Sequence, residues 1–184
     1  MHGIAIVGAN GSGKTTLCRA LAQELGCFSI DIEDYSFEPS EIPYEKPRPK
    51  SQVRALIAQE IKQHPAFVLS AVNGDLGAEI NAYYDVIVYL HAPLETRLER
   101  VAHRSAQAFG KRMEAGGDLH AQEQAFLHFV KNRTMEKIDR WVEKQCVPVW
   151  HVDATMPTAQ LVEMLAGRLK DEGYKKEEGE VQNA

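Results

Sequence analysis

The 184-residue sequence has few cysteines, no long apolar run and no excess of positive charge. The spacing of Cys18, Cys27 and Cys146 matches neither a metal site nor a disulfide framework, so we expect small buried side chains in a reducing compartment. No segment approaches the ~20 apolar residues of a membrane span, and the N-terminal segment lacks the basic and apolar regions of a signal peptide. These absences predict a cytoplasmic protein with no membrane partner.

The charge balance also limits the partners. A net charge of −5 argues against a nucleic-acid partner, because duplex phosphates favour a basic protein face. With 44% hydrophobic and 26% charged residues, the composition is that of a globular domain. We expect a single domain over residues 1–172. The polar segment 173–184 has no apolar period, which predicts a disordered tail.

A phosphate-binding P-loop is the strongest motif. The pattern G-x-x-x-x-G-K-[ST] is matched by Gly8-Ala9-Asn10-Gly11-Ser12-Gly13-Lys14-Thr15. An apolar segment precedes it, and Leu17, Leu21 and Leu25 after it share one helical face, so the strand–loop–helix context is present. The pattern predicts that Lys14 reaches the β- and γ-phosphates of ATP and that Thr15 ligates Mg²⁺. The nucleotide-binding segment is expected to comprise Asn10, Gly11, Ser12, Gly13, Lys14, Thr15 and Thr16.

Apolar segments alternate with helical patterns along the whole chain. Strands are expected at Gly3–Val7, Cys27–Ile32, Ala66–Val72, Asp85–His91 and Val147–Val152. This alternation predicts an α/β fold with a five-stranded parallel sheet between helical layers. Binding residues then lie at the carboxyl ends of the strands.

Carboxylates follow the second expected strand. Asp31, Glu33 and Asp34 stand where Mg²⁺ could be held through water, or where a base could meet an acceptor hydroxyl. The alternative is a solvated acidic turn that caps the next segment. The third strand is followed by Asn73 and then, two residues later, by Asp75, so no acid ends it directly. This increases the importance of Asp31 as a metal ligand.

Residues 35–54 are rich in proline and aromatic side chains, which excludes a helix over 35–50 and favours a binding flap over an ordinary surface loop. Arg48 and Arg54 flank this flap, either to meet an anionic acceptor or simply as solvated surface charges. Asn73 and Asp34 are further candidates for acceptor binding.

Basic residues recur in the expected helix 94–109 and beyond it. Arg97, Arg100 and Arg104 share one face without acidic neighbours three or four positions away, so phosphates or salt bridges to other elements should neutralise them. Lys111 and Arg112 lie in a glycine-flanked segment that predicts a lid over 105–120, with an exposed connection as the alternative.

A long helix is expected over 120–145. Its apolar face comprises Phe126, Phe129, Val130 and Trp141, and the candidate acceptor-binding residue Arg133 lies on the same face.

The chain resembles the P-loop nucleotide and small-molecule kinases of the adenylate-kinase and shikimate-kinase type. It looks closest to a bacterial group labelled AAA-family ATPases, on Gly-Ser-Gly-Lys at 11–14, Asp-x-Glu-Asp-Tyr at 31–35 and Gly-Gly-Asp-Leu at 116–119. The resemblance implies the strand order 2-3-1-4-5 and a helical lid. It also implies that Arg100 and Arg104 grip the nucleotide, that the loop at Asp153-Ala154 packs on adenine, and that Asp31 serves metal and acceptor.

These observations together predict an ATP- and Mg²⁺-dependent phosphotransferase acting on a small molecule. The expected catalytic residues are Lys14, Asp31, Arg104 and Arg112. The acidic cluster favours a hydroxyl acceptor, because a second anion would be repelled, while a nucleoside monophosphate stays open. The alternative is a nucleotide-binding switch or slow ATPase that acts through a protein partner. Either a monomer or a homodimer is compatible with the sequence.

Overall fold

Five parallel strands form the central sheet. The computed structural model describes residues 2–42 and 44–174. The strands are β1 (His2–Gly8), β2 (Phe28–Asp31), β3 (Ala66–Ala71), β4 (Tyr84–His91) and β5 (Val149–Asp153). Their order is β2-β3-β1-β4-β5, which confirms the α/β fold and the implied order 2-3-1-4-5. All six residues of β3 are buried, as expected for a parallel strand covered on both faces.

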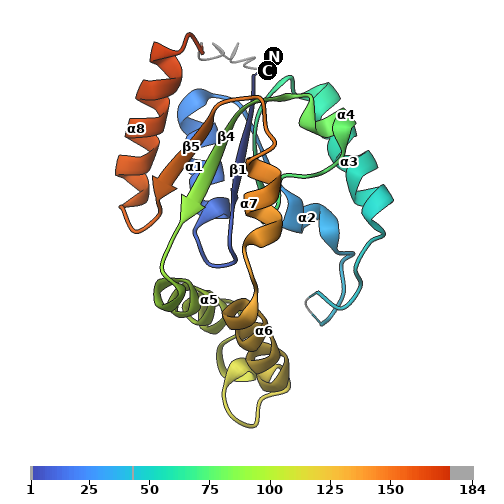
Figure 1. Cartoon of the computed structure of the whole chain (residues 1–184). Helices are drawn as coiled ribbons and strands as arrows, with labels where there is room; N and C mark the ends of the chain where they lie inside the picture. Colours follow the sequence, from blue (N-terminus) through green and yellow to red (C-terminus); the bar gives the residue numbers. More distant parts are fainter. Residues whose placement is uncertain (1, 43, 175–184) are drawn as a thin grey trace, which may run out of the picture.

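Two helical layers cover the sheet (Figure 1). One layer is formed by α1 (Lys14–Leu25) and α8 (Thr158–Asp171), and the other by α3 (Lys50–Gln63), α4 (Ala78–Asn81) and α7 (Glu136–Val142). Successive side chains of a strand point to opposite faces. Accordingly, Ile4 and Ile6 join the core beneath α1 and α8, whereas Ala5 and Val7 join the core beneath the other layer. The two cores hold β1, and therefore the loop that follows it, at the centre of the sheet.

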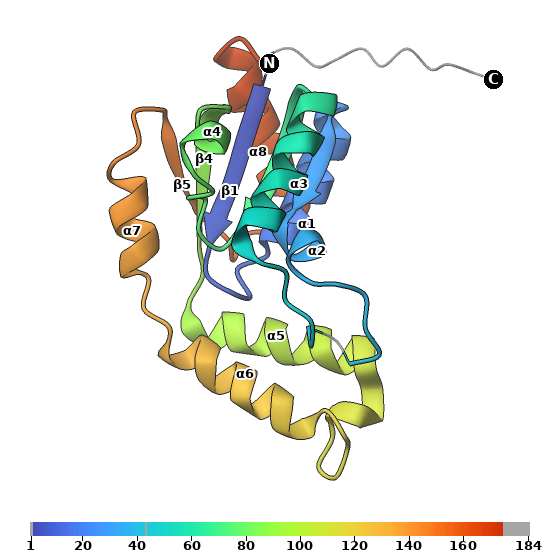
Figure 2. The same cartoon turned by 90° about the vertical axis from the view of Figure 1, so that its right-hand side faces the viewer.

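A helical lid projects beyond the carboxyl ends of the strands (Figure 2). It consists of α5 (Leu94–Phe109), the 3₁₀ turn η1 (Gly110–Met113) and α6 (His120–Asn132). On the other side of the same edge, α2 (Ile32–Ser36) follows β2 directly, with Asp31 as its N-cap. The P-loop, the end of β2 and the lid therefore border the same edge of the sheet.

The prediction of one helix over 120–145 is wrong, because the chain leaves the helix at Arg133. Arg133 is extended (φ −71°, ψ 123°), and α7 begins only at Glu136. Phe126 of α6 lines a cavity of the lid, whereas Ile138 and Trp141 of α7 pack on the sheet. Because these two partners lie in different directions, one straight helix cannot contact both.

Within residues 2–42 and 44–174, no helix combines the length and apolar character that a membrane span requires. Residues 175–184, most of the expected tail, lie outside the described part of the chain. Tyr174 lies within it and still belongs to the folded domain. Its backbone N–H donates to Leu169 O at 2.9 Å, and its ring packs on the core beneath α8.

Candidate functional site

The P-loop wraps the space between β1 and α1. Gly11 and Gly13 have φ values of 78° and 93°, a left-handed conformation that side chains rarely adopt. Gly11 also lies against the lid, since a Cβ added there would come within 2.4 Å of Arg97 O. A side chain at position 11 or 13 would therefore strain the backbone of the loop. Packing against α5 holds this backbone in a conformation that binds anions.

Lys14 lies inside this loop. Its Nζ donates to Ala9 O at 2.8 Å. Burial lowers the pKa of the Lys14 ammonium from its ordinary 10.5 to about 8, and the nearby carboxylates of Glu33 and Asp31 oppose that shift. An anionic phosphate in the loop would favour the charged form of Lys14, which burial alone disfavours.

A cleft of about 750 Å³ opens above the P-loop and beside α5. It is lined by the P-loop and α1, by the ends of β2, β3 and β4, by α5 and by the loop after β5, all of which meet at one edge of the sheet. The structure brings most of the candidate residues to this cleft: Asn10, Gly11, Ser12, Gly13, Lys14, Thr15, Thr16, Asp31, Asn73, Arg100, Arg104 and Ala154.

Asp31 is a buried carboxylate, with 8% of its surface exposed. It ends β2 opposite Ser70 of β3, and its Oδ1 accepts a hydrogen bond from the N–H of Glu33 at 3.2 Å. Asp31 and Thr15 both line the cleft, and hard oxygen donors of this kind suit Mg²⁺. Among the described residues, no three His, Cys, Asp or Glu side chains could hold a metal by themselves. This donor set therefore fits an ion that is held largely by nucleotide phosphates and water.

Two arginines of α5 connect the lid to the cleft. Arg100 donates from Nη2 to Ala154 O at 2.9 Å and from Nη1 to Ser12 O at 3.4 Å. It therefore joins the P-loop to the loop after β5. Arg104 lies one turn further along and forms an ion pair with Glu33 at 3.7 Å. Backbone carbonyls thus accept hydrogen bonds from Arg100, whereas a carboxylate pairs with Arg104.

Arg133 reaches the P-loop from the end of α6. Its Nη1 donates to Asn10 Oδ1 at 2.9 Å, and its guanidinium lies 5.3 Å from the centre of the Phe129 ring. Desolvation by the surrounding protein lowers the pKa of Arg133. The break after α6 places this arginine beside the phosphate loop, and its role in acceptor binding stays a prediction.

Besides Arg133, four candidate residues lie outside the cleft. Asp34 is exposed and pairs with Arg19 at 3.6 Å. Arg54 lies on the outer part of α3, beside Gly77. Arg112 forms a bidentate pair with Asp118 at the exposed tip of the lid, at 2.8 Å for the shorter contact. Asp153 turns to the opposite side of its loop from Ala154, and its Oδ1 accepts from the N–H of Thr155 at 2.9 Å.

The flap over 35–54 is held by its own hydrogen bonds. Arg48 Nη1 donates to the carbonyl oxygens of Phe37 and of Tyr35, and Phe37 bridges to Pro47 across the flap. Arg48 therefore closes the loop instead of meeting a ligand. The flap runs from α2 toward the far end of α5 (Figure 2). There, Phe37 and Tyr44 line a second cavity of about 360 Å³ together with lid residues.

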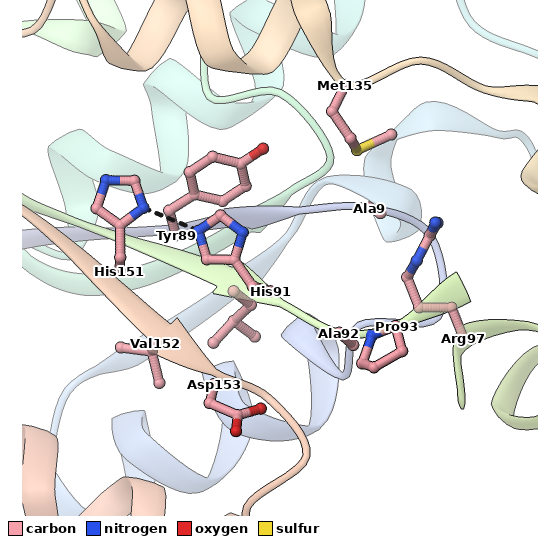
Figure 3. Close-up of a pocket in the computed structure, with 11 residues that line it drawn as sticks. Ala9, Tyr89, His91, Ala92, Pro93, Arg97, Met135, His151, Val152 and Asp153 are labelled. Carbon is pink, nitrogen blue, oxygen red and sulfur yellow. Dashed lines mark hydrogen bonds between the residues drawn. The ribbon is translucent and has the colours of Figure 1, made fainter. Parts of the chain in front are cut away.

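A third cavity, of about 370 Å³, is bordered by Ala9 of the P-loop and by residues at the ends of two strands (Figure 3). It lies at the ends of β4 and β5, where His91 Nε2 and His151 Nδ1 are 2.8 Å apart. Burial and the neighbouring His151 lower the pKa of His91. These two histidines are 60 positions apart and meet only through the pairing of β4 with β5.

The chain is similar in sequence to several known proteins. A family model described as an AAA domain, AAA_18, matches residues 4–123. The uncharacterized protein YqaC of Bacillus subtilis is 29% identical over 161 residues, covering 86% of each chain. A cytidylate kinase of Ignicoccus hospitalis is 28% identical over 122 residues, covering 60% of this chain and 69% of that one.

The fold also matches solved structures. Shikimate kinase from Acinetobacter baumannii in complex with shikimate has a TM-score of 0.56 and 16% sequence identity, and the match covers 95% of this chain and 96% of that one. At this identity the likeness concerns the fold alone. The kinase fold inferred from strand order and P-loop is thereby confirmed.

Proposed function

We propose that this chain, which belongs to the AAA_18 family and is similar to P-loop small-molecule kinases, transfers the γ-phosphoryl group of ATP to a small acceptor. The observation that carries the proposal is the convergence of Lys14, Thr15 and Asp31 on one cleft. The P-loop amides and Lys14 hold the phosphates. Thr15, with Asp31, would hold Mg²⁺, which offsets phosphate charge when bound.

Asp31 is the group that meets the acceptor. It orients the acceptor hydroxyl and takes its proton as the oxygen bonds to the γ-phosphorus; the bond from that phosphorus to the β–γ bridging oxygen breaks, and ADP leaves. The acidic surroundings formed by Asp31 and Glu33 favour a neutral hydroxyl over a phosphate acceptor. A nucleoside monophosphate is the alternative acceptor, with Arg104 freed from Glu33 to receive its phosphate.

Two arginines of the lid lie near the site of phosphoryl transfer, and a third can join them. Arg104 lines the cleft directly, and Arg133 reaches Asn10 of the P-loop. Arg112 joins them only when the lid moves, because its present partner is Asp118. Positive charge placed around the equatorial oxygens stabilises the transition state in phosphoryl transfer.

The direct test is ADP formation from ATP and Mg²⁺, measured alone and with a panel of nucleosides, nucleoside monophosphates, sugars and hydroxy acids. A rate that one acceptor raises, with that acceptor recovered as its phosphate, supports the proposal. A slow rate that no acceptor changes contradicts it. That result would favour a switch or slow ATPase, for which the exposed flap residues Ile42 and Tyr44 offer a docking surface for a protein partner.

A further inference from the structure

The second cavity carries a buried charge that the proposed mechanism does not use. We propose that this cavity, between the flap and the lid, binds the body of the acceptor, and that Glu123 selects a flat, apolar ring bearing an amino group. This inference rests on the proposed function, because it identifies the class of molecule that the kinase phosphorylates. It assigns Glu123 as a specificity-determining residue and not as a catalytic one.

The cavity has the size and character of a site for a ring. Its volume of about 360 Å³ falls within the range of small-molecule pockets. Most of its lining is apolar, and four aromatic side chains contribute to it. They come from the flap and from both lid helices: Phe37, Tyr44, Phe109 and Phe126. Aromatic walls favour the flat face of a ring over a polyol, whose hydroxyl groups would lose their water without replacement.

Glu123 is the unusual member of this lining. It lies in the first turn of α6, and only 8% of its surface is exposed. Its Oε1 has no hydrogen-bond partner among the residues that the structure describes. A buried carboxylate oxygen without a donor costs free energy, so such groups usually meet a ligand or a partner. A ligand that donates N–H bonds from an amino group would meet this need.

The cavity adjoins the phosphate cleft. Glu33, Phe37 and Arg104 line both spaces. A molecule whose ring lies in the cavity can therefore extend a hydroxyl group past Glu33 toward Asp31 and the P-loop. This continuity connects a recognition site for the ring with the site of phosphoryl transfer.

The charges of the lining select against acidic acceptors. Two carboxylates, Glu33 and Glu123, border the cavity, and Arg104 is paired with the first of them. A hydroxy acid would therefore bring a third carboxylate beside Glu123, while Arg104 of this lining already faces Glu33. A neutral or cationic ring with an amino group avoids this repulsion and supplies the missing donor.

Matched pairs of nucleosides test the proposal, because adenosine and cytidine carry an amino group where inosine and uridine carry a carbonyl oxygen. Binding of each is measured by isothermal titration calorimetry to the full chain, saturated beforehand with Mg²⁺ and β,γ-methylene ATP. We expect the amino member of at least one pair to bind about 10- to 100-fold more tightly. The variant Glu123→Gln should reduce that preference to less than about threefold.

Glu114→Gln is the matched control, since Glu114 is an exposed carboxylate of the same lid. It should keep the preference of the parent protein. Equal binding of both members, no binding of any amino member, or a preference that survives in Glu123→Gln would each overturn the proposal. The comparison of amino and carbonyl nucleosides uses the unaltered protein. It therefore tests the proposal even if Glu123→Gln does not fold.

Phosphoryl transfer to the same nucleosides is measured separately. If the amino member binds selectively but is never phosphorylated, the recognition site stands and the proposed kinase activity fails. If a compound without an amino group is phosphorylated and Glu123→Gln leaves its kcat/KM unchanged, the kinase activity stands and the assignment of Glu123 fails. The two failures are thus distinguishable.

Discussion

The P-loop and the lid tip hold their cationic side chains in different ways. At the P-loop, Lys14 and Arg100 donate to backbone carbonyls, which are fixed by the fold. At the lid tip, Arg112 pairs with Asp118, and both side chains are substantially exposed. The first arrangement is ready for phosphate before any ligand binds. The second must be exchanged for a ligand, so the comparison separates a preorganised nucleotide site from groups that need a movement of the lid.

The largest expected effect on kcat comes from substitution of Asp31, which lies at the edge of the preorganised nucleotide site. Asp31→Asn should lower kcat with the acceptor by about 10²- to 10⁴-fold, the range of general acid–base catalysis. Stability should change little, because asparagine caps a helix as well as aspartate and can keep the bond to Glu33 N–H. Steady-state ADP formation and thermal melting check the two parts. Asp34→Asn is the control, and a fall as large in that variant would contradict a special role for Asp31.

Arg133 gives the next effect in size. Arg133→Met keeps the apolar stem that packs near Phe129 but removes the donor to Asn10. We expect kcat/KM to fall by about 10- to 100-fold, because hydrogen bonds to charged groups are worth about 1.5–3 kcal/mol. Arg140→Met is the control, since Arg140 forms an exposed pair with Glu136 on the next helix. Equal kinetics in both variants would place Arg133 outside the mechanism.

Arg112 tests the lid directly. Arg112→Ala should leave the free energy of unfolding within about 1 kcal/mol, because exposed ion pairs contribute little. Its kcat should nevertheless fall by about tenfold if closure of the lid brings this arginine to the phosphates. Chemical denaturation and steady-state kinetics measure the two quantities. An unchanged kcat would mean that the pair with Asp118 is a feature of the lid surface alone.

The smallest expected effect is the uptake of a proton by Lys14 when ATP binds. Its pKa of about 8 in the free protein means that the ammonium is partly neutral near pH 8.5, while bound phosphates favour the charged form. Binding of ATP at pH 8.5–9 should therefore take up a fraction of a proton, and binding at pH 7 almost none. Calorimetry in buffers with different ionisation enthalpies measures this uptake. Lys14→Met, which has no ammonium, should abolish it.

The lowered pKa of Lys14 also makes the stability of the protein depend on pH. Its folded pKa, about 8, lies below the ordinary 10.5, so the unfolded chain binds more protons between these values. The contribution of Lys14 to the free energy of unfolding therefore rises as the pH rises through this window. Comparison of the parent protein with Lys14→Met at pH 8 and pH 10 isolates that contribution.

Patterns within one element were predicted well. The P-loop, the strand order through the family resemblance, and the helix at 94–109 all agree with the structure. The continuous helix over 120–145 failed because its apolar period persists through Arg133, while its two halves pack on different partners. Local periodicity indicates which residues are apolar along a helix, but the direction of the packing partner decides whether the helix continues.

The candidate site was predicted unevenly for the same reason. Residues at the ends of strands, such as Asp31 and Asn73, line the cleft, because every parallel strand ends at one edge. Asp34 is an acid like Asp31, and Arg112 is an arginine like Arg104, but both lie outside the cleft. Glu123 was not singled out, because nothing in its neighbourhood in the sequence distinguishes it from the other acidic residues of the lid.

The sequence by itself determined the phosphate loop, the parallel sheet and the edge where the site lies. These features depend on glycine conformations, apolar periods and short connections, which are properties of neighbouring residues. Only the tertiary structure decided which charged side chains are buried, paired or turned to the cleft. Arg133 meeting Asn10, His91 meeting His151 and the burial of Glu123 arise from packing between segments distant in the chain, and such packing leaves no local pattern to read.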